Sequence, residues 1–310
     1  MNPSLIDVSN ACLIAGLVVS SIVLAIAWLS PRVTRISTWF NLLLSGIIFD
    51  ISYMLIIGAQ RGSQPGFGIC LFSAMMTYAA PALTAYAYAA FCLELFFLAR
   101  YAQSPTPAVN MNPGLKACLL GIPYFIHLGI AMEVLVIGLT DRSRVHRDED
   151  TSLYCHLEWH NPAKVTAGLS LVAIIIALFA LGFTIRALYR NPRDPAMKLF
   201  RETTKAHRMV IRIAIFSVLP VIGLLFSVLK FRPRTPASGV FVIIFSLFPL
   251  WSAIVLGSQA DIFRALMFWK SGASSSFSVE PRGLPEGHGL SELGKSDCSL
   301  VQCDTNDWKQ

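Results

Sequence analysis

The sequence is poor in charged residues, which make up 14% of its 310 positions, whereas hydrophobic residues make up 55%. Soluble domains carry roughly 25% charged residues. A chain this apolar cannot cover its own surface with polar groups, so lipid must cover part of it. The shortage of charge therefore predicts an integral membrane protein. The net charge of +7 is then expected to mark cytoplasmic loops that contact membrane lipid, and no nucleic-acid partner is expected.

Other absences narrow the class further. No base occurs in residues 1–10, so the positively charged start of a cleavable signal peptide is missing. Segment 239–258 has no lysine for a retinal Schiff base, and His127 is the one histidine well inside an apolar segment. Metal hydrolases and haem carriers of the membrane need several such ligands. The seven cysteines are too widely spread for a disulfide scaffold or a paired metal site. We therefore expect no enzymatic activity, no cofactor and no metal.

Long apolar runs are what the sequence does have. A membrane-spanning helix needs about 20 apolar residues. Seven segments meet this length, and backbone hydrogen bonding in lipid requires that they be helices. The predicted fold is an all-α membrane protein, a bundle of seven transmembrane helices at 11–29, 37–58, 70–99, 117–139, 165–188, 209–229 and 239–258.

Basic residues favour one orientation, because cytoplasmic loops are enriched in Lys and Arg. With the N-terminus outside, fourteen bases lie near the inner face and eight on the outer side, although the basic cluster at 230–234 points the other way. Residues 1–10 are then extracellular, 11–270 form the transmembrane domain, and the Ser- and Gly-rich segment 271–310 is a disordered cytoplasmic tail. Apolar residues at mostly helical spacing in 261–270 predict a short interfacial helix before that tail.

Two cysteines fall on the predicted outer side. Cys70 begins the third span, and Cys155 lies in the longest outer loop. Both would face an oxidising compartment, and an exposed free thiol is a liability. We predict a Cys70–Cys155 disulfide that ties this loop over the bundle; the alternative is two unpaired thiols.

Three carboxylates lie within predicted spans. Asp50 is in the middle of the second span, Glu94 in the inner half of the third, and Glu133 in the fourth. A carboxylate at that depth is costly and should face the bundle interior. Asp50 is either a cation or proton site or a hub of structural hydrogen bonds. The same two alternatives apply to Glu94, for which a base near the sixth span (His207, Arg208 or Arg212) is a candidate partner.

The segment 186–212 carries eight bases against two acids. Contact with anionic lipid stabilises such a segment by about 1 kcal/mol per base. The alternative role is a docking surface for a cytosolic protein, with the fifth and sixth helices extended beyond the membrane.

Several motifs occur in the same order as in one receptor family. They are Asp50, Cys70 with Cys155, Tyr78-Ala-Ala-Pro81, Arg100-Tyr101, Pro220, and Pro249 followed by Asp261-Ile-Phe-Arg264. The chain thereby resembles rhodopsin-like G-protein-coupled receptors, and is most similar to the orphan seven-helix receptors of higher fungi. The resemblance implies that Arg100 and Tyr101 meet a G protein and that the carboxylate of helix two binds sodium.

The sequence also departs from the pattern of that family. Ala99 stands where an acid normally precedes the arginine, so a resting contact of Arg100 needs another partner, for which Glu94 is a candidate. Arg100 lies about one and a half turns further from Cys70 than the family spacing. Phe248 replaces the usual Asn before the proline of helix seven.

The predicted function is a receptor of the plasma membrane that senses an unknown small-molecule or peptide ligand and signals to a heterotrimeric G protein. Coupling is assigned to Arg100, Tyr101, Arg208 and Arg212, and the speculative ligand pocket to Tyr53, Tyr78 and Trp159. A small transporter that relays protons through Asp50, Glu94 and Glu133 is the main alternative. Against this alternative, the sequence shows no internal repeat, which many transporters have. A structural membrane scaffold would show neither activity.

Overall fold

The computed structural model describes residues 3–30, 35–101, 111–147, 152–159, 161–190, 238–258 and 262. Side chains are described for all of these except 3–4, 188–190 and 238–242. Contacts within the chain separate two units, Met1–Ser271 and Gly272–Gln310, and every described residue belongs to the first. The following description therefore concerns the first unit.

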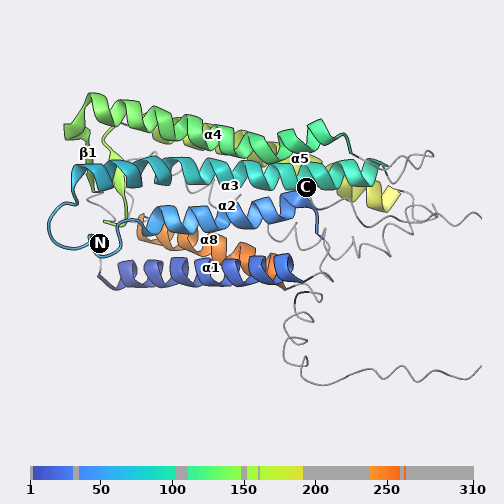
Figure 1. Ribbon diagram of the computed structural model, residues 1–310, viewed down its shortest axis with the longest axis horizontal. Coiled ribbons are helices and arrows are strands. Elements are labelled where there is room, and N and C mark those ends of the chain that lie inside the picture. Colours follow the sequence, from blue (N-terminus) through green and yellow to red (C-terminus); the bar gives the residue numbers. More distant parts are fainter. Residues whose placement is uncertain are drawn as a thin grey trace, which may run out of the picture. The chain divides into compact units, whose positions relative to one another are not determined.

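Six helices of the described chain overlap six of the seven predicted spans (Figure 1). They are α1 (Pro3–Leu29), α2 (Ser37–Met54), α3 (Phe67–Tyr101), α4 (Pro113–Thr140), α5 (Asn161–Arg190) and α8 (Ser238–Gly257). The helix that overlaps the span 37–58 ends four residues early, at Met54. The predicted span 209–229 lies outside the described residues, as does the interfacial helix 261–270 apart from Ile262.

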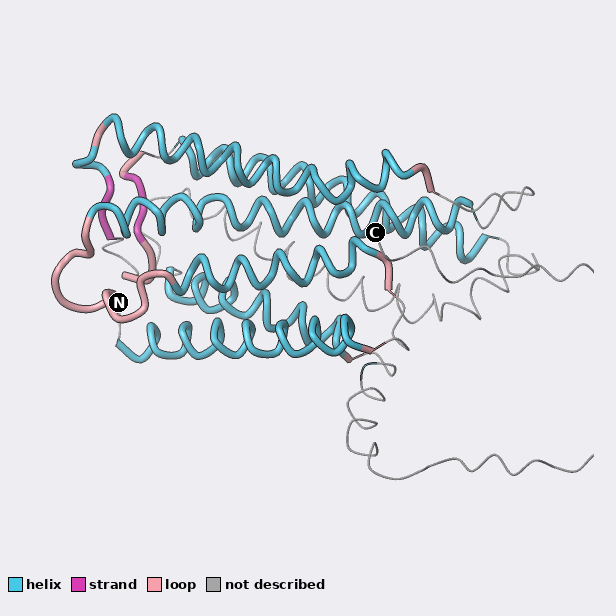
Figure 2. The backbone as a smooth tube through the Cα atoms, in the orientation of Figure 1, coloured by secondary structure: helices cyan, strands magenta, loops and turns pink. Residues whose placement is uncertain are grey.

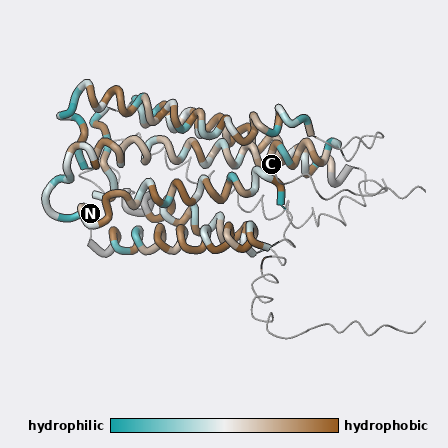
Figure 3. The backbone as a smooth tube through the Cα atoms, viewed as in Figure 1, coloured by the Kyte–Doolittle hydropathy of each residue, from teal (hydrophilic) through white to brown (hydrophobic). Residues whose placement is uncertain are grey.

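Within the described chain, four helices are long and apolar enough to cross a membrane: α1 from Leu5, α3, α4, and α5 up to Ala187. Figure 3 shows hydrophobic residues along much of their length. The 18-residue helix α2 is more polar, because its buried face carries Thr38, Asn41, Ser45, Asp50 and Ser52. This polarity faces the protein interior, where neighbouring helices replace lipid.

Helix α3 is the centre of the described bundle, because it packs against α2, α4 and α5, whereas α1 packs against α2 and α8. Figures 1 and 2 show these helices running side by side. Small side chains on α3 let its neighbours approach closely. Those that are buried include Ala74, Ala79, Ala80, Ala82, Ala87 and Ala90.

The first helix begins eight residues before the predicted span 11–29, because its polar residues find partners inside the protein. Ser9 Oγ lies 2.5 Å from Ser246 Oγ of α8. The side-chain amide of Asn10 pairs with that of Gln60, at 2.6 Å and 3.1 Å. Hydropathy alone places these polar residues outside the helix, whereas tertiary hydrogen bonds allow the helix to include them.

The loop between α4 and α5 contains a short β-hairpin that the sequence did not predict. Its strands are β1 (Val145–Arg147) and β2 (Cys155–Leu157), paired antiparallel and preceded by a 3₁₀ turn, η1 (Arg142–Arg144). Figure 2 shows the hairpin in magenta at one end of the helices. We call this the disulfide end, and the opposite end, where α3 finishes, the Arg100 end.

A close contact between α1 and α8 generates a prediction. A Cβ added at Gly257 would lie 2.7 Å from Val23 Cγ2. Gly257→Ala should therefore destabilise the protein by about 1–3 kcal/mol, as overpacking commonly does. Val23→Ala removes the obstructing methyl groups, so the double variant should be more stable than the sum of the two single effects predicts.

The measurement is the melting temperature of the purified protein in detergent. Gly168→Ala is the matched control, because a Cβ there meets nothing within 4 Å. It should be neutral or slightly stabilising, since Ala favours helix over Gly by about 1 kcal/mol. Strict additivity of Gly257→Ala and Val23→Ala would contradict the described α1–α8 packing.

Candidate functional site

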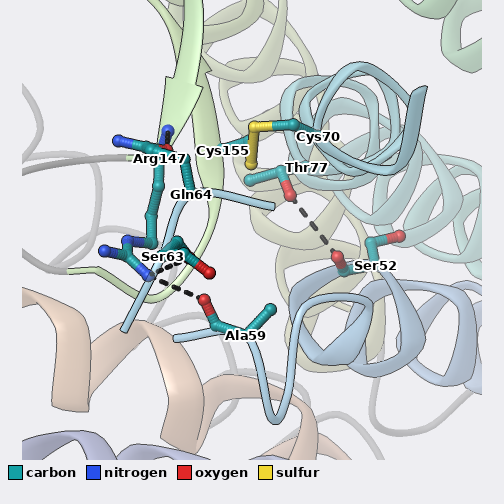
Figure 4. Close-up of a disulfide and its surroundings, with 8 residues drawn as sticks. All are labelled: Ser52, Ala59, Ser63, Gln64, Cys70, Thr77, Arg147 and Cys155. Carbon is teal, nitrogen blue, oxygen red and sulfur yellow. Dashed lines mark hydrogen bonds between the residues drawn. A yellow bond between two sulfur atoms is a disulfide. The ribbon is translucent and has the colours of Figure 1, made fainter. Parts of the chain in front are cut away.

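The predicted disulfide between Cys70 and Cys155 is confirmed, with 5.3 Å between the two Cα atoms (Figure 4). Both residues are buried, together with Leu157, Ala74, Val134 and other apolar side chains. The bond joins β2 to the first turn of α3. It therefore fixes one strand of the hairpin to the central helix of the bundle.

Arg147 fixes the other strand. It pairs with Cys155 across the hairpin, and its guanidinium donates hydrogen bonds to the carbonyl oxygens of Ala59 (2.8 Å), Gly62 (3.0 Å) and Ser63 (3.5 Å). Figure 4 shows the Arg147 side chain reaching this turn between α2 and α3. Gly62 has a φ of 89°, which only glycine adopts readily. Sequence reasoning missed Arg147 because its partners are backbone atoms more than 80 positions away.

Removal of the disulfide gives a second prediction. Cys155→Ser should lower the surface level and the melting temperature, since loss of a native disulfide commonly costs about 2–5 kcal/mol. Cys118→Ser is the control, because Cys118 is an exposed free cysteine. Parent-like stability and surface expression of Cys155→Ser would show that Arg147 and apolar packing hold the hairpin without the disulfide.

Aromatic side chains gather beneath the hairpin. Tyr53 stacks on Phe49 with 4.7 Å between ring centroids, and meets Tyr154 and Phe245 edge-on at 5.7 Å and 5.8 Å. Tyr78 packs against the buried apolar cluster that contains Cys70 and Cys155. Tyr53 of the predicted ligand pocket therefore lies in an aromatic cluster to which the hairpin loop itself contributes Tyr154.

Trp159, the third predicted pocket residue, lies apart from this cluster in its described contacts. Its side chain is 45% exposed, and the Arg144 guanidinium lies over its ring at 5.7 Å. Arg144 Nε also donates to Asp141 Oδ2 at 2.6 Å. Hydrogen bonds from Ser143 and from Arg144 lower the pKa of the Asp141 carboxyl. Trp159 therefore belongs to a polar surface group at the disulfide end.

Asp50 is fully buried in the bundle, and neither carboxylate oxygen has a hydrogen-bond partner among the described residues. A Cβ added at Gly16 of α1 would lie 3.0 Å from Oδ2 and 3.2 Å from Oδ1 of Asp50, and 3.2 Å from the backbone nitrogen of Leu250 in α8. The carboxylate therefore points to the place where α1 and α8 meet α2. Sequence reasoning missed Gly16. The feature that could have pointed to it is a glycine inside an apolar helix.

The absence of a side chain at Gly16 gives a third prediction. Gly16→Ala should lower the melting temperature, by an amount equivalent to about 1–3 kcal/mol, because neither the carboxylate nor the Leu250 backbone can withdraw easily. Asp50→Ala in the same chain should reduce that loss, since it removes the two oxygens.

Gly129→Ala is the control, because a Cβ there meets nothing within 4 Å. A Gly16→Ala protein as stable as the parent, with or without Asp50, would mean that α1 does not lie against the carboxylate.

Glu94 is buried near the Arg100 end, and its Oε2 accepts a hydrogen bond from Thr38 Oγ1 of α2. Its predicted partners His207, Arg208 and Arg212 lie outside the described residues. Thr38 was missed because a single threonine at the start of a helix carries no signal for a partner 56 positions away. Glu133 is half-buried on α4. The three carboxylates thus lie on three different helices.

Arg100 and Tyr101 are the last two residues of α3. Arg100 is exposed, its guanidinium lies 5.9 Å from the centroid of the Phe96 ring, and it forms no ion pair within the described part of the chain. Ala99 beside it is completely buried. Arg100 therefore presents its charge at the end of the central helix.

In the ranges that the structure describes, no group of three or more His, Cys, Asp or Glu side chains is arranged to hold a metal ion. The features that remain are the clamped hairpin at one end, the buried carboxylate of Asp50 between the helices, and the exposed arginine at the other end.

Comparison with known structures shows that the fold of the chain is rhodopsin-like. The structure is similar to the crystal structure of squid rhodopsin, with a TM-score of 0.62 and 12% sequence identity over 95% of this chain and 90% of that one. No protein-family model matches the sequence, and no curated protein sequence matches it. At this identity the likeness concerns the fold.

Proposed function

We propose that this chain is a G-protein-coupled receptor of the plasma membrane that senses an extracellular ligand and signals to a cytosolic heterotrimeric G protein. The observation that carries the proposal is the rhodopsin-like fold over 95% of the chain. The confirmed Cys70–Cys155 disulfide supports it, because this pair is one of the motifs on which the family resemblance rests.

The two ends of the bundle would have different roles. At the disulfide end, the hairpin, the aromatic cluster around Tyr53, and Tyr78 would receive the ligand. At the Arg100 end, Arg100 and Tyr101 would meet the G protein, together with Arg208 and Arg212.

Asp50, buried between α1, α2 and α8, would be the cation or proton site that responds to helix movement. Helix α8 has no lysine, so the proposed ligand is not a retinal bound as a Schiff base.

A cation- or proton-coupled transporter remains the second candidate. It is favoured by Asp50, whose oxygens lack partners among the described residues, and it would also use Glu94 and Glu133. The hydrogen bond from Thr38 gives Glu94 a structural role, which weakens a relay through it. Substrate-dependent ion flux in proteoliposomes, unaffected by Arg100 variants, would favour the transporter over the receptor.

The fourth prediction concerns the receptor function. The chain is co-expressed with G proteins and screened against small molecules and peptides for ligand-dependent nucleotide exchange. With an active ligand, Arg100→Ala should abolish exchange while the surface level stays normal. Arg100→Lys should also fail, because Lys keeps the charge but loses the planar five-donor group of Arg.

The matched control is Lys116→Ala, a basic residue in the first turn of α4, at the same end of the bundle. It should signal like the parent. If Arg100→Lys signals normally, charge alone is sufficient, and the specific role given to the guanidinium is wrong.

A further inference from the structure

The hairpin at the disulfide end brings two histidines together. His146 of β1 pairs directly with His156 of β2, and their ring centroids are 4.5 Å apart with an interplanar angle of 70°. Directly opposite residues of an antiparallel pair have Cβ atoms about 4.5–5.5 Å apart. The two imidazoles are therefore adjacent on one face of the hairpin, although nine residues separate them in the sequence.

The side-chain alternation of the strands defines which face this is. Cys155 and Leu157 flank His156 in β2, and both are buried against the bundle. Successive side chains of a strand point to opposite faces. The histidines therefore occupy the face turned away from the Cys70–Cys155 disulfide, and each is half-buried.

The hairpin holds the histidine pair in place through both strands. The disulfide ties β2 to α3, and Arg147 ties β1 to the carbonyl groups of Ala59 and Gly62. Side chains that are already held in position bind their ligand more tightly, because they lose less conformational freedom on binding. Each histidine lies next to one of these anchors in its strand.

We propose that His146 and His156 form a binding site for a transition-metal ion, with Zn²⁺ or Cu²⁺ as the fitting ions. Imidazole nitrogen suits both ions and is a common metal ligand in proteins. Zn–N bonds of about 2.0–2.1 Å place two nitrogens that share a tetrahedral zinc about 3.3 Å apart. The edge-to-face rings reach this arrangement by rotation about χ2, a torsion with broad minima.

The site is open, because no third His, Cys, Asp or Glu joins the pair among the described residues. Two protein ligands leave the remaining positions of a tetrahedral ion to water or to a group on another molecule. The proposal is independent of the receptor function, since it rests on the hairpin geometry alone.

Two arginines lie within two residues of His146. The first, Arg144, belongs to the 3₁₀ turn that precedes β1. Its guanidinium is engaged by Asp141, at 2.6 Å, and by the ring of Trp159. The carboxylate offsets its charge, so repulsion of a cation at His146 is reduced. Arg147 lies on the opposite strand face, where it contacts the carbonyl groups of the neighbouring turn.

The test uses the full chain, purified in detergent or nanodiscs without a polyhistidine tag, and the metal alone. Zn²⁺ and Cu²⁺ binding is measured by titration calorimetry and by the rise in melting temperature. The parent should bind Zn²⁺ in the micromolar range. His146→Ala and His156→Ala should each weaken binding at least about tenfold, because loss of a residue that only hydrogen-bonds to a metal ligand already has an effect of that size. The double variant should bind Zn²⁺ at least as weakly as the poorer single variant.

His288→Ala, in the segment 272–310, is the matched control and should bind like the parent. If an alanine variant has a lower metal-free melting temperature, the corresponding asparagine variant replaces it, because it keeps a polar side chain. No Zn²⁺ or Cu²⁺ binding by the parent below about 100 μM, equal affinity of the parent and the double variant, or a loss as large in His288→Ala would each overturn the proposal. In the first two cases the pair is an aromatic contact that stabilises the hairpin.

Discussion

Every peptide group within a hydrocarbon layer must find its hydrogen-bond partner inside the protein, and this constraint underlies the rest of the structure. It makes each apolar segment a helix and confines irregular backbone to the helix ends. It also confines polar side chains to contacts between helices. Tyr124 of α4 donates to Asn41 of α2 at 2.6 Å, and Thr166 of α5 donates to the carbonyl oxygen of Tyr78 in α3 at 3.0 Å. Polar groups thus specify which helix faces meet, where apolar packing alone does not distinguish lipid from protein.

A buried acid in the middle of the bundle departs from this pattern. Asp50 is buried without a partner among the described residues, in a space that exists because Gly16 has no side chain. An uncompensated carboxylate is costly in such surroundings, and it is the kind of local conflict that marks functional sites. Glu94 differs from it, since Thr38 satisfies one of its oxygens. The two acids look equivalent in the sequence, but the structure gives them different surroundings.

The disulfide end is built differently from the helices, because its backbone is irregular and is held by specific bonds. The disulfide and Arg147 secure the two strands of the hairpin, and Leu153 packs against Ile6 from the start of α1. The loop that follows α4 thereby connects α1, the α2–α3 turn and α3. A rigid loop in this position would limit how a ligand reaches the aromatic cluster around Tyr53, and it carries the histidine pair on its other face.

Composition and the length of the apolar runs determined the helical membrane fold, and six helices overlap the segments that hydropathy selected, because a helix in lipid is specified locally by apolar length. The same local information located Cys70 and Cys155 on one side, which was sufficient to predict their bond. The extension of α1 to Pro3, the contact of Trp159 with Arg144, the position of Gly16 beside Asp50, and the hydrogen bond from Thr38 to Glu94 were decided by the tertiary structure. So was the His146–His156 pair, since strand register depends on the disulfide and on Arg147. These features depend on contacts between residues far apart in the chain, and no local pattern in one sequence records such contacts.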